Sequence, residues 1–180
     1  MLKNENWQKF FKAQDKSGWC GPAVIQMVLK AASIKKSQKS IANDVYQKWY
    51  GVTPQIMIVY LSRFFNSLGY KESAEKSDII FHLKKKRLII VDWWDDIDLD
   101  EKPDGHYSLI LNFDKKQNKF TLADPSAGRG IWQMDAEEFR SKWYDYLDIN
   151  KKIKLNGWLL WIDPASKFKN KHQFLKLIAF

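Results

Sequence analysis

The stretch Gln14-Asp-Lys-Ser-Gly-Trp-Cys20-Gly-Pro-Ala23 decides how the first part of the chain folds and where its chemistry lies. Gly18 allows a tight turn before the cysteine, and Pro22 suits the first turn of a helix, where its missing N–H group costs no hydrogen bond. The apolar residues that follow fall on one face at helical spacing. The pattern therefore predicts a helix over residues 21–32, with Cys20 at its N-terminus.

A cysteine at the start of a helix is well placed for nucleophilic chemistry. A thiol attacks as its thiolate, and a free thiol with a pKa of about 8.5 is only a few per cent ionised at neutral pH. The partial positive charge at a helix N-terminus favours the anion. A lone cysteine is otherwise most often a small buried apolar side chain, but the flanking glycines and proline favour Cys20 as a nucleophile.

Gln14 lies six residues before Cys20 and is the candidate for stabilising the oxygen of a carbonyl under attack. If the chain folds back, its side-chain amide and the backbone N–H of Cys20 form an oxyanion hole. Each donor in such a hole contributes roughly 3–4 kcal/mol.

His106 is the candidate base among three histidines. It opens a predicted strand directly after a turn, whereas His82 lies within a predicted helix and His172 lies in the basic C-terminal segment. Asp124 follows eighteen residues later, at the end of a hairpin that returns beside His106. Its carboxylate is therefore predicted to accept the second ring N–H and to stabilise the imidazolium. Taken alone, Asp124 before a proline is better explained as the opening of an ordinary turn, and it is the position of His106 eighteen residues earlier that favours the catalytic role.

The periodicity of apolar residues predicts an α+β fold, with a helical first half and an antiparallel sheet in the second half. Helices are expected over residues 21–32, 37–49, 53–69 and 77–87, and strands over residues 88–94, 106–113, 119–123, 130–134 and 156–162. Asp135 is expected to cap one more helix between the strands. We assign residues 1–164 to one domain and residues 165–180 to a basic tail or helix.

The composition limits the classes of partner and the compartment that we expect for this protein. The net charge of +9 would suit an anionic partner, but no zinc-finger spacing or aromatic RNA-binding motif accompanies it, so no nucleic acid is predicted. No apolar run reaches the length of a membrane span, the first residues lack the apolar core of a signal peptide, and a single cysteine suits a reducing compartment. We expect a cytoplasmic protein without cofactor or metal. The tail is expected to dock on its own domain, with membrane contact as the less favoured alternative.

Two further features have competing interpretations. The segment 92–104 holds seven acidic residues and one lysine directly ahead of His106. It is either a solvated loop or a rim of the cleft that selects a basic substrate. Trp19, Trp93 and Trp94 are candidates to line a substrate groove, although core packing is the more common use of tryptophan.

At this point three motif blocks carry a family resemblance: Gln14…Cys20-Gly-Pro-Ala23, Gly105-His106-Tyr-Ser-Leu-Ile110 and Leu122-Ala-Asp124-Pro125. They resemble the papain-like cysteine peptidases that cut double-glycine leaders from bacteriocins, over roughly residues 8–164. The resemblance implies a catalytic helix followed by an antiparallel sheet, with the family's Gln, Cys, His and Asp falling on the four residues numbered 14, 20, 106 and 124. It also implies no cofactor.

The sequence departs from the transporter-linked members of that family. Trp19 stands where those members usually carry an Asp, and no ATP-binding cassette or phosphate-binding glycine loop is present. We therefore expect a stand-alone cysteine hydrolase. Within this class we favour a peptidase that cleaves amide bonds of a peptide or protein through a Cys20 thioester. A thiol acyltransferase or amidase with the same residues, or a peptide-binding module without catalysis, are the alternatives.

Overall fold

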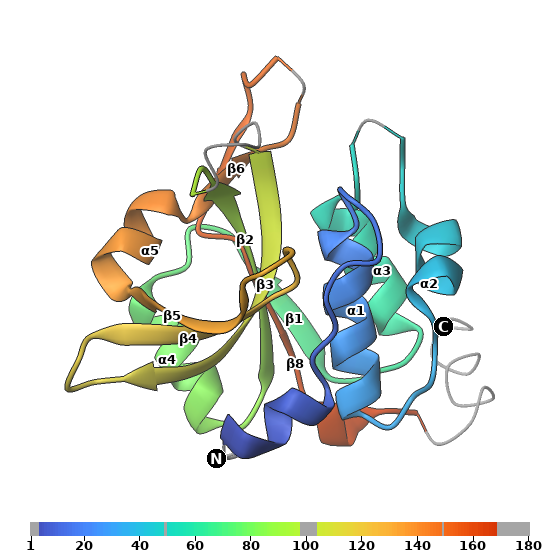
Figure 1. Ribbon diagram of the computed structural model, residues 1–180, viewed down its shortest axis with the longest axis horizontal. Helices are drawn as coiled ribbons and strands as arrows, with labels where there is room; N and C mark the ends of the chain where they lie inside the picture. The colour runs from blue at the N-terminus through green and yellow to red at the C-terminus, as the bar shows by residue number, and fades with distance from the viewer. Residues whose placement is uncertain (1–3, 49, 98–103, 149, 169–180) are drawn as a thin grey trace.

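The computed structural model describes residues 4–48, 50–97, 104–148 and 150–168 (Figure 1). The helices are α1 Cys20–Ala31, α2 Gln38–Val45, α3 Pro54–Ser62, α4 Lys76–Lys84 and α5 Ala136–Lys142, with short 3₁₀ helices at Asn4–Lys9 and Pro164–Ser166. The strands are β1 Leu68–Lys71, β2 Leu88–Asp95, β3 Asp104–Asp114, β4 Lys119–Asp124, β5 Gly130–Asp135, β6 Tyr144–Tyr146, β7 Lys154–Asn156 and β8 Leu159–Ile162.

Six of these strands form one antiparallel sheet in the order β1-β8-β2-β3-β4-β5, and β6 and β7 form a separate hairpin. Helices α1, α2 and α3 gather on one side of the sheet, and α4 and α5 lie on the other (Figure 1). Strand β2 is buried on both faces: Ile90 packs into the core beneath α1, and its neighbours Ile89 and Val91 pack into the core beneath α5. This two-sided burial explains why β2 reads as a continuous apolar run.

Helix α1 begins at Cys20, as the sequence predicts. Gly18, in the turn before it, has a φ of +74°, which glycine adopts without steric cost. Gly21 has a different reason to be glycine: a Cβ there would lie 2.7 Å from the side chain of Val52. The loop between α2 and α3 therefore packs directly against the first turn of α1, next to the nucleophile candidate.

Several predicted boundaries are wrong. The helix predicted to reach Gly69 ends at Ser62, because Gly69 lies in β1, where its missing Cβ makes room for the ring of Trp161 on β8. The predicted strand 156–162 is two strands, separated at Gly157 with a φ of +56°. Helix α2 ends at Val45, four residues early.

Two of the differences concern elements rather than their ends. Helix α4 begins at Lys76, and its capping box is formed by Glu75 and Asp78 instead of the expected Ser77. The hairpin β6–β7 and strand β1 are not predicted, because three- and four-residue strands leave almost no periodicity to detect.

The chain beyond the last strand contacts the helical side. The Lys167 ammonium donates to the Ala32 carbonyl at 2.8 Å, and the Phe168 N–H donates to the Phe64 carbonyl at 2.9 Å. Residues 169–180, with His172 and most of the expected tail, lie outside the described part of the chain. None of the described helices is both long and apolar enough to cross a bilayer.

Candidate active site

Cys20, His106 and Asp124 come together at the junction of α1 with the sheet. Cys20 is the first residue of α1, and its side chain lies close enough to the ring of His106, near the start of β3, to help raise the pKa of the imidazole. The other side of the ring is held by Asp124, the last residue of β4, whose Oδ1 lies 2.7 Å from His106 Nε2. Because Asp124 takes Nε2, Nδ1 is the ring nitrogen left for the sulfur.

The Asp124 carboxylate is fully buried and has a partner for each oxygen. Oδ1 accepts the backbone N–H of Ser126 at 2.9 Å in addition to the His106 ring, and Oδ2 accepts Nη1 of Arg129 at 3.2 Å. The Ser126 hydroxyl lies 3.4 Å from His106 Nε2. These contacts fix the orientation of the carboxylate that accepts the hydrogen bond of the ring N–H.

Burial and hydrogen bonding act in opposite directions on this pair. Burial by itself would lower the pKa of His106, but the hydrogen bonds from Asp124 and then Cys20, together with their charges, raise it to about 10. Burial raises the pKa of Asp124, but the hydrogen bond and charge of His106, followed by Ser126 and Arg129, lower it to about 2. At neutral pH the two groups therefore form an imidazolium–carboxylate pair.

The backbone around Gln14 is fixed from both sides. The Gln14 N–H donates to the carbonyl of Pro125 at 2.8 Å, directly after Asp124. The buried amide of Gln38, at the start of α2, donates to the Ala13 carbonyl at 2.7 Å and accepts the Asp15 N–H at 2.9 Å. Gln14 is thereby tied to the same corner of the molecule as the other three predicted residues. Sequence reasoning missed Gln38, although a polar residue on the core-facing side of an expected helix was a usable signal.

Comparison with known proteins identifies the family. The model of the Peptidase_C39 like family matches residues 3–149, which is most of the chain. The chain belongs to this family. A search of curated proteins gives no significant match.

Solved structures of C39 peptidase domains share the fold. The peptidase domain of Streptococcus ComA, a bi-functional ABC transporter involved in quorum sensing, aligns with 84% of this chain and 96% of that domain, at a TM-score of 0.61 and 16% identity. A double glycine motif protease from an AMS/PCAT transporter, solved with its leader peptide, aligns over 84% and 89%, with a TM-score of 0.56 and 17% identity. A putative C39-like peptidase from Bacillus anthracis aligns over 85% and 94%, with a TM-score of 0.58 and 12% identity.

The papain-like α+β fold predicted from the sequence is thus confirmed, and the C39-like family and fold together support a cysteine peptidase.

The three tryptophans predicted to line a groove, out of nine in the chain, are placed differently from one another. Trp93 is fully buried, meets the His106 ring edge-to-face at 5.5 Å, and donates its Nε1 hydrogen to Ser108 Oγ at 3.1 Å. The groove interpretation is therefore wrong for Trp93, because its ring supports the back of His106 inside the core. Trp94 is also largely buried, stacked on Tyr144 of the β6–β7 hairpin.

Trp19 alone among the three remains partly exposed beside the nucleophile candidate. As the N-cap residue of α1 it packs against Tyr46, at 6.3 Å between ring centroids, and the Lys16 ammonium lies 5.0 Å from its ring. It is the one tryptophan of the predicted set whose position suits contact with a substrate.

A buried carboxyl group lies near the catalytic candidates and was not singled out by the sequence. Asp92 on β2 pairs with Tyr107 on β3 and is almost inaccessible to solvent. Burial raises its pKa well above the usual range, helped by the charges of Asp145 and Cys20, so the surroundings favour the protonated form of Asp92. Asp145, from β6, lies over Gly105, where any Cβ would overlap its carboxylate. This contact explains the glycine that precedes the histidine.

Asp95 of the acidic segment and His82 both make contacts that stabilise the fold. Asp95 is ion-paired with Arg129, whereas residues 98–103 lie outside the described part of the chain. His82 stacks on Trp161 at 5.2 Å and lies 3.0 Å from the Arg87 guanidinium; burial, followed by the Arg87 charge, lowers its pKa. Among the described residues, no cluster of His, Cys, Asp and Glu is arranged to hold a metal ion.

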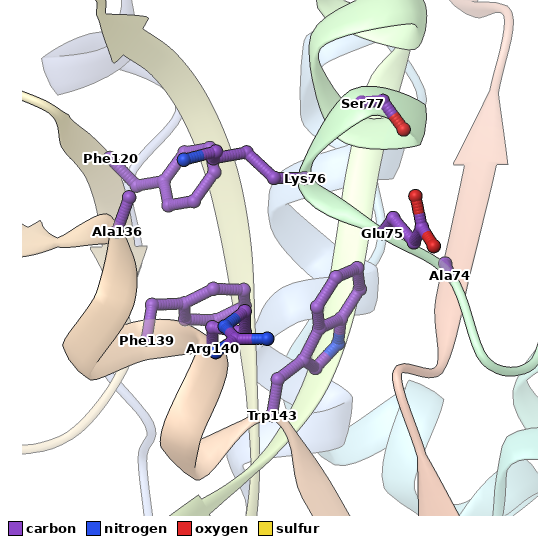
Figure 2. A pocket seen from close by; sticks show the side chains of 9 residues that line it. All are labelled: Ala74, Glu75, Lys76, Ser77, Phe120, Ala136, Phe139, Arg140 and Trp143. Atoms are coloured by element: carbon purple, nitrogen blue, oxygen red, sulfur yellow. The ribbon is translucent and has the colours of Figure 1, made fainter.

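A cavity of about 510 Å³ lies between α4 and α5, on the side of the sheet away from α1. Figure 2 shows the rings of Phe120, Phe139 and Trp143 along it, with Lys76 and Arg140 at its edge. Lys76 and Arg140 both form ion pairs with Glu137, so their positive charges offset the negative charge of a residue of the protein itself. None of the catalytic candidates lines this cavity.

Proposed function

We propose that this protein is a cysteine peptidase in which Cys20 is the nucleophile, His106 the general base and acid, and Asp124 the group that orients the imidazole. The observation that carries the proposal is the buried His106–Asp124 pair, joined at 2.7 Å, beside the Cys20 side chain at the N-terminus of a helix. A binding module without catalysis has no use for a buried imidazole that lies between a carboxylate and a cysteine sulfur.

The reaction proceeds by acyl transfer. The Cys20 sulfur attacks the carbonyl carbon of the scissile amide, and the electron pair of the C=O bond moves to the oxygen. The backbone N–H of Cys20 and the side-chain amide of Gln14 stabilise that oxyanion. His106 then protonates the leaving amine, the C–N bond breaks, and a thioester remains on Cys20. Water, deprotonated by His106, hydrolyses the thioester to the acid and the free thiol.

The substrate class follows from the family. One of the similar structures holds a leader peptide, and another is a peptidase domain of a transporter. We therefore expect a peptide or protein substrate here as well. Trp19, which is partly exposed directly before Cys20, is the side chain expected to contact it.

Two measurements test the proposal. A peptide library incubated with the wild type should give cleavage products that Cys20→Ala does not give, identified by mass spectrometry. Alkylation of Cys20 by iodoacetamide should proceed well below pH 8 and should slow in His106→Ala. An unreactive thiol, or alkylation indifferent to His106, would contradict the proposal. Products that carry an added amine instead of water would indicate acyl transfer by the same residues.

A further inference from the structure

The second oxygen of the Asp124 carboxylate is held by a residue outside the predicted motif. Arg129 Nη1 donates to Asp124 Oδ2 at 3.2 Å, on the side of the carboxylate away from the His106 ring. The Asp124 side chain has no solvent access, and the Arg129 side chain is only 11% exposed. In this environment a hydrogen bond between charged groups is stronger than at the surface, and its loss leaves a buried acceptor unpaired.

The loop between β4 and β5 is built to bring Arg129 back to the strand that carries Asp124. The residues on either side, Gly128 and Gly130, have φ values of +82° and +67°, a conformation that side chains other than glycine rarely adopt. The Arg129 N–H donates to the carbonyl of Ser126 at 3.3 Å, which closes the turn.

Asp95 fixes the guanidinium from the far side. Its Oδ2 accepts Nη1 of Arg129 at 2.5 Å and its Oδ1 accepts Nη2 at 3.0 Å, a two-point contact that sets the plane of the guanidinium. Asp95 Oδ1 also accepts the N–H of Ile97 at 3.2 Å. Asp95 is the last residue of β2, so a chain of contacts runs from the end of β2 through the β4–β5 loop to the end of β4.

We propose that Arg129 and Asp95 are positioning residues of the catalytic site: the Asp95-anchored guanidinium locks the orientation of the Asp124 carboxylate, which in turn holds His106 for reaction with Cys20. The inference rests on the proposed function, because it concerns the same site. Neither residue touches the substrate, and both act through Asp124. One hydrogen of Arg129 Nη1 binds each of the two carboxylates, Asp124 and Asp95. A lysine, with its single nitrogen, does not reproduce this forked arrangement.

Loss of the fork has a defined effect on the imidazole. Without Arg129, the Asp124 carboxylate is free to turn about its Cβ–Cγ bond, and His106 Nε2 loses a fixed acceptor. The titratable groups around the ring are Asp124, Cys20 and the buried Asp92, and the hydrogen bond from Asp124 is the strongest influence that raises the pKa of His106. The pKa of His106 is therefore expected to fall from about 10 when the orientation is lost.

The experiment uses Arg129→Met, Arg129→Lys and Asp95→Asn in the full chain. The His106 ring is titrated by NMR on protein labelled in its histidine nitrogens, and kcat and KM are measured on a peptide that the wild type cleaves. Both Arg129 variants should lower the His106 midpoint by about one pH unit. They should also lower kcat about tenfold or more, with KM little changed. Asp95→Asn should have a smaller effect, which disappears in the Arg129→Met background because the two residues act in series.

Arg140→Met is the matched control, because Arg140 is a largely exposed arginine of α5 that pairs with Glu137. It should leave the His106 midpoint and kcat unchanged. If Arg129→Met does not fold, Arg129→Lys and Asp95→Asn still decide the question. A folded Arg129→Lys with the wild-type midpoint and kcat would overturn the inference, as would an upward shift in Arg129→Met, which would indicate a charge effect without positioning. The proposed function is tested separately, by the dependence of Cys20 alkylation on His106 in the wild type.

Discussion

Replacing Gln38 by methionine removes both hydrogen bonds that hold the backbone on either side of Gln14, while it keeps a side chain of similar length. Gln38 is only 1% exposed, whereas Ala13 and Asp15 are exposed residues, so the cost comes mainly from the two lost hydrogen bonds to the Ala13 carbonyl and the Asp15 N–H. A neutral hydrogen bond contributes about 1 kcal/mol, and an unpaired buried group costs about 1–3 kcal/mol. The free energy of unfolding is therefore expected to fall by about 2–3 kcal/mol.

The same substitution should affect catalysis in a selective way. Removal of one oxyanion donor typically lowers kcat by about 10²- to 10³-fold, and a displaced Gln14 should lose at least about tenfold. Alkylation by iodoacetamide is a displacement at a tetrahedral carbon, so no oxyanion forms and Gln14 is not needed. Gln38→Met should therefore cleave peptide slowly while Cys20 is alkylated at the wild-type rate.

The assays are urea denaturation, steady-state peptide cleavage and iodoacetamide alkylation of the same preparation. Gln26→Met is the control, because it removes a hydrogen bond of 2.8 Å between α1 and the Lys36 carbonyl, away from Gln14. It should lose about 1 kcal/mol of stability and keep its kcat. If Gln38→Met loses stability but cleaves at the wild-type rate, the backbone near Gln14 has no part in the oxyanion hole and the reasoning is refuted.

Three further predictions concern the histidine and its surroundings. Asp124→Asn should lower kcat by about 10³- to 10⁴-fold while the protein stays folded, as measured by peptide cleavage and circular dichroism. Gly105→Ala should place a methyl group on the Asp145 carboxylate and lower the melting temperature, and Asp145→Ala in the same chain should restore it. The raised pKa of His106 stabilises the fold fully below its usual value of 6.5, and this stabilisation is lost as the pH rises through about 10. Urea denaturation should therefore show stability falling over this interval, and falling less in His106→Gln.

The parts of the site that the sequence predicts are those set by local structure. Cys20 begins a helix that a glycine and a proline delimit, and His106 and Asp124 are joined by one hairpin, in which Leu109 pairs with Ala123. Such features depend on turns and periodicity within about twenty residues, and these are encoded nearby in the chain. Their proximity in space was therefore accessible from the sequence.

The residues that support the site were not accessible in the same way. Gln38 contacts Ala13 across 25 positions and Arg129 contacts Asp95 across 34 positions, and no periodicity links residues that far apart. For the same reason, the burial of Asp92 was not predicted. Trp93 follows Asp92 in an acidic stretch that suggested a surface loop, but both side chains are buried, because β2 lies between β3 and β8 in the centre of the sheet.

The alternating charges around the site explain why the supporting residues matter for its stability. Asp95, Arg129, Asp124 and His106 carry alternating negative and positive charges, and the series ends at the Cys20 sulfur. Each charge is largely removed from water, so each relies on its neighbours for compensation, and removal of any one leaves the next uncompensated. Substitutions along the series should therefore not be additive, because the first one already disrupts the arrangement on which the others depend. In the arrangement that we propose, His106 and Asp124, at the ends of the interior strands β3 and β4, are held rigid by Asp95 of β2 acting through Arg129, and neither of these two supporting residues contacts the substrate.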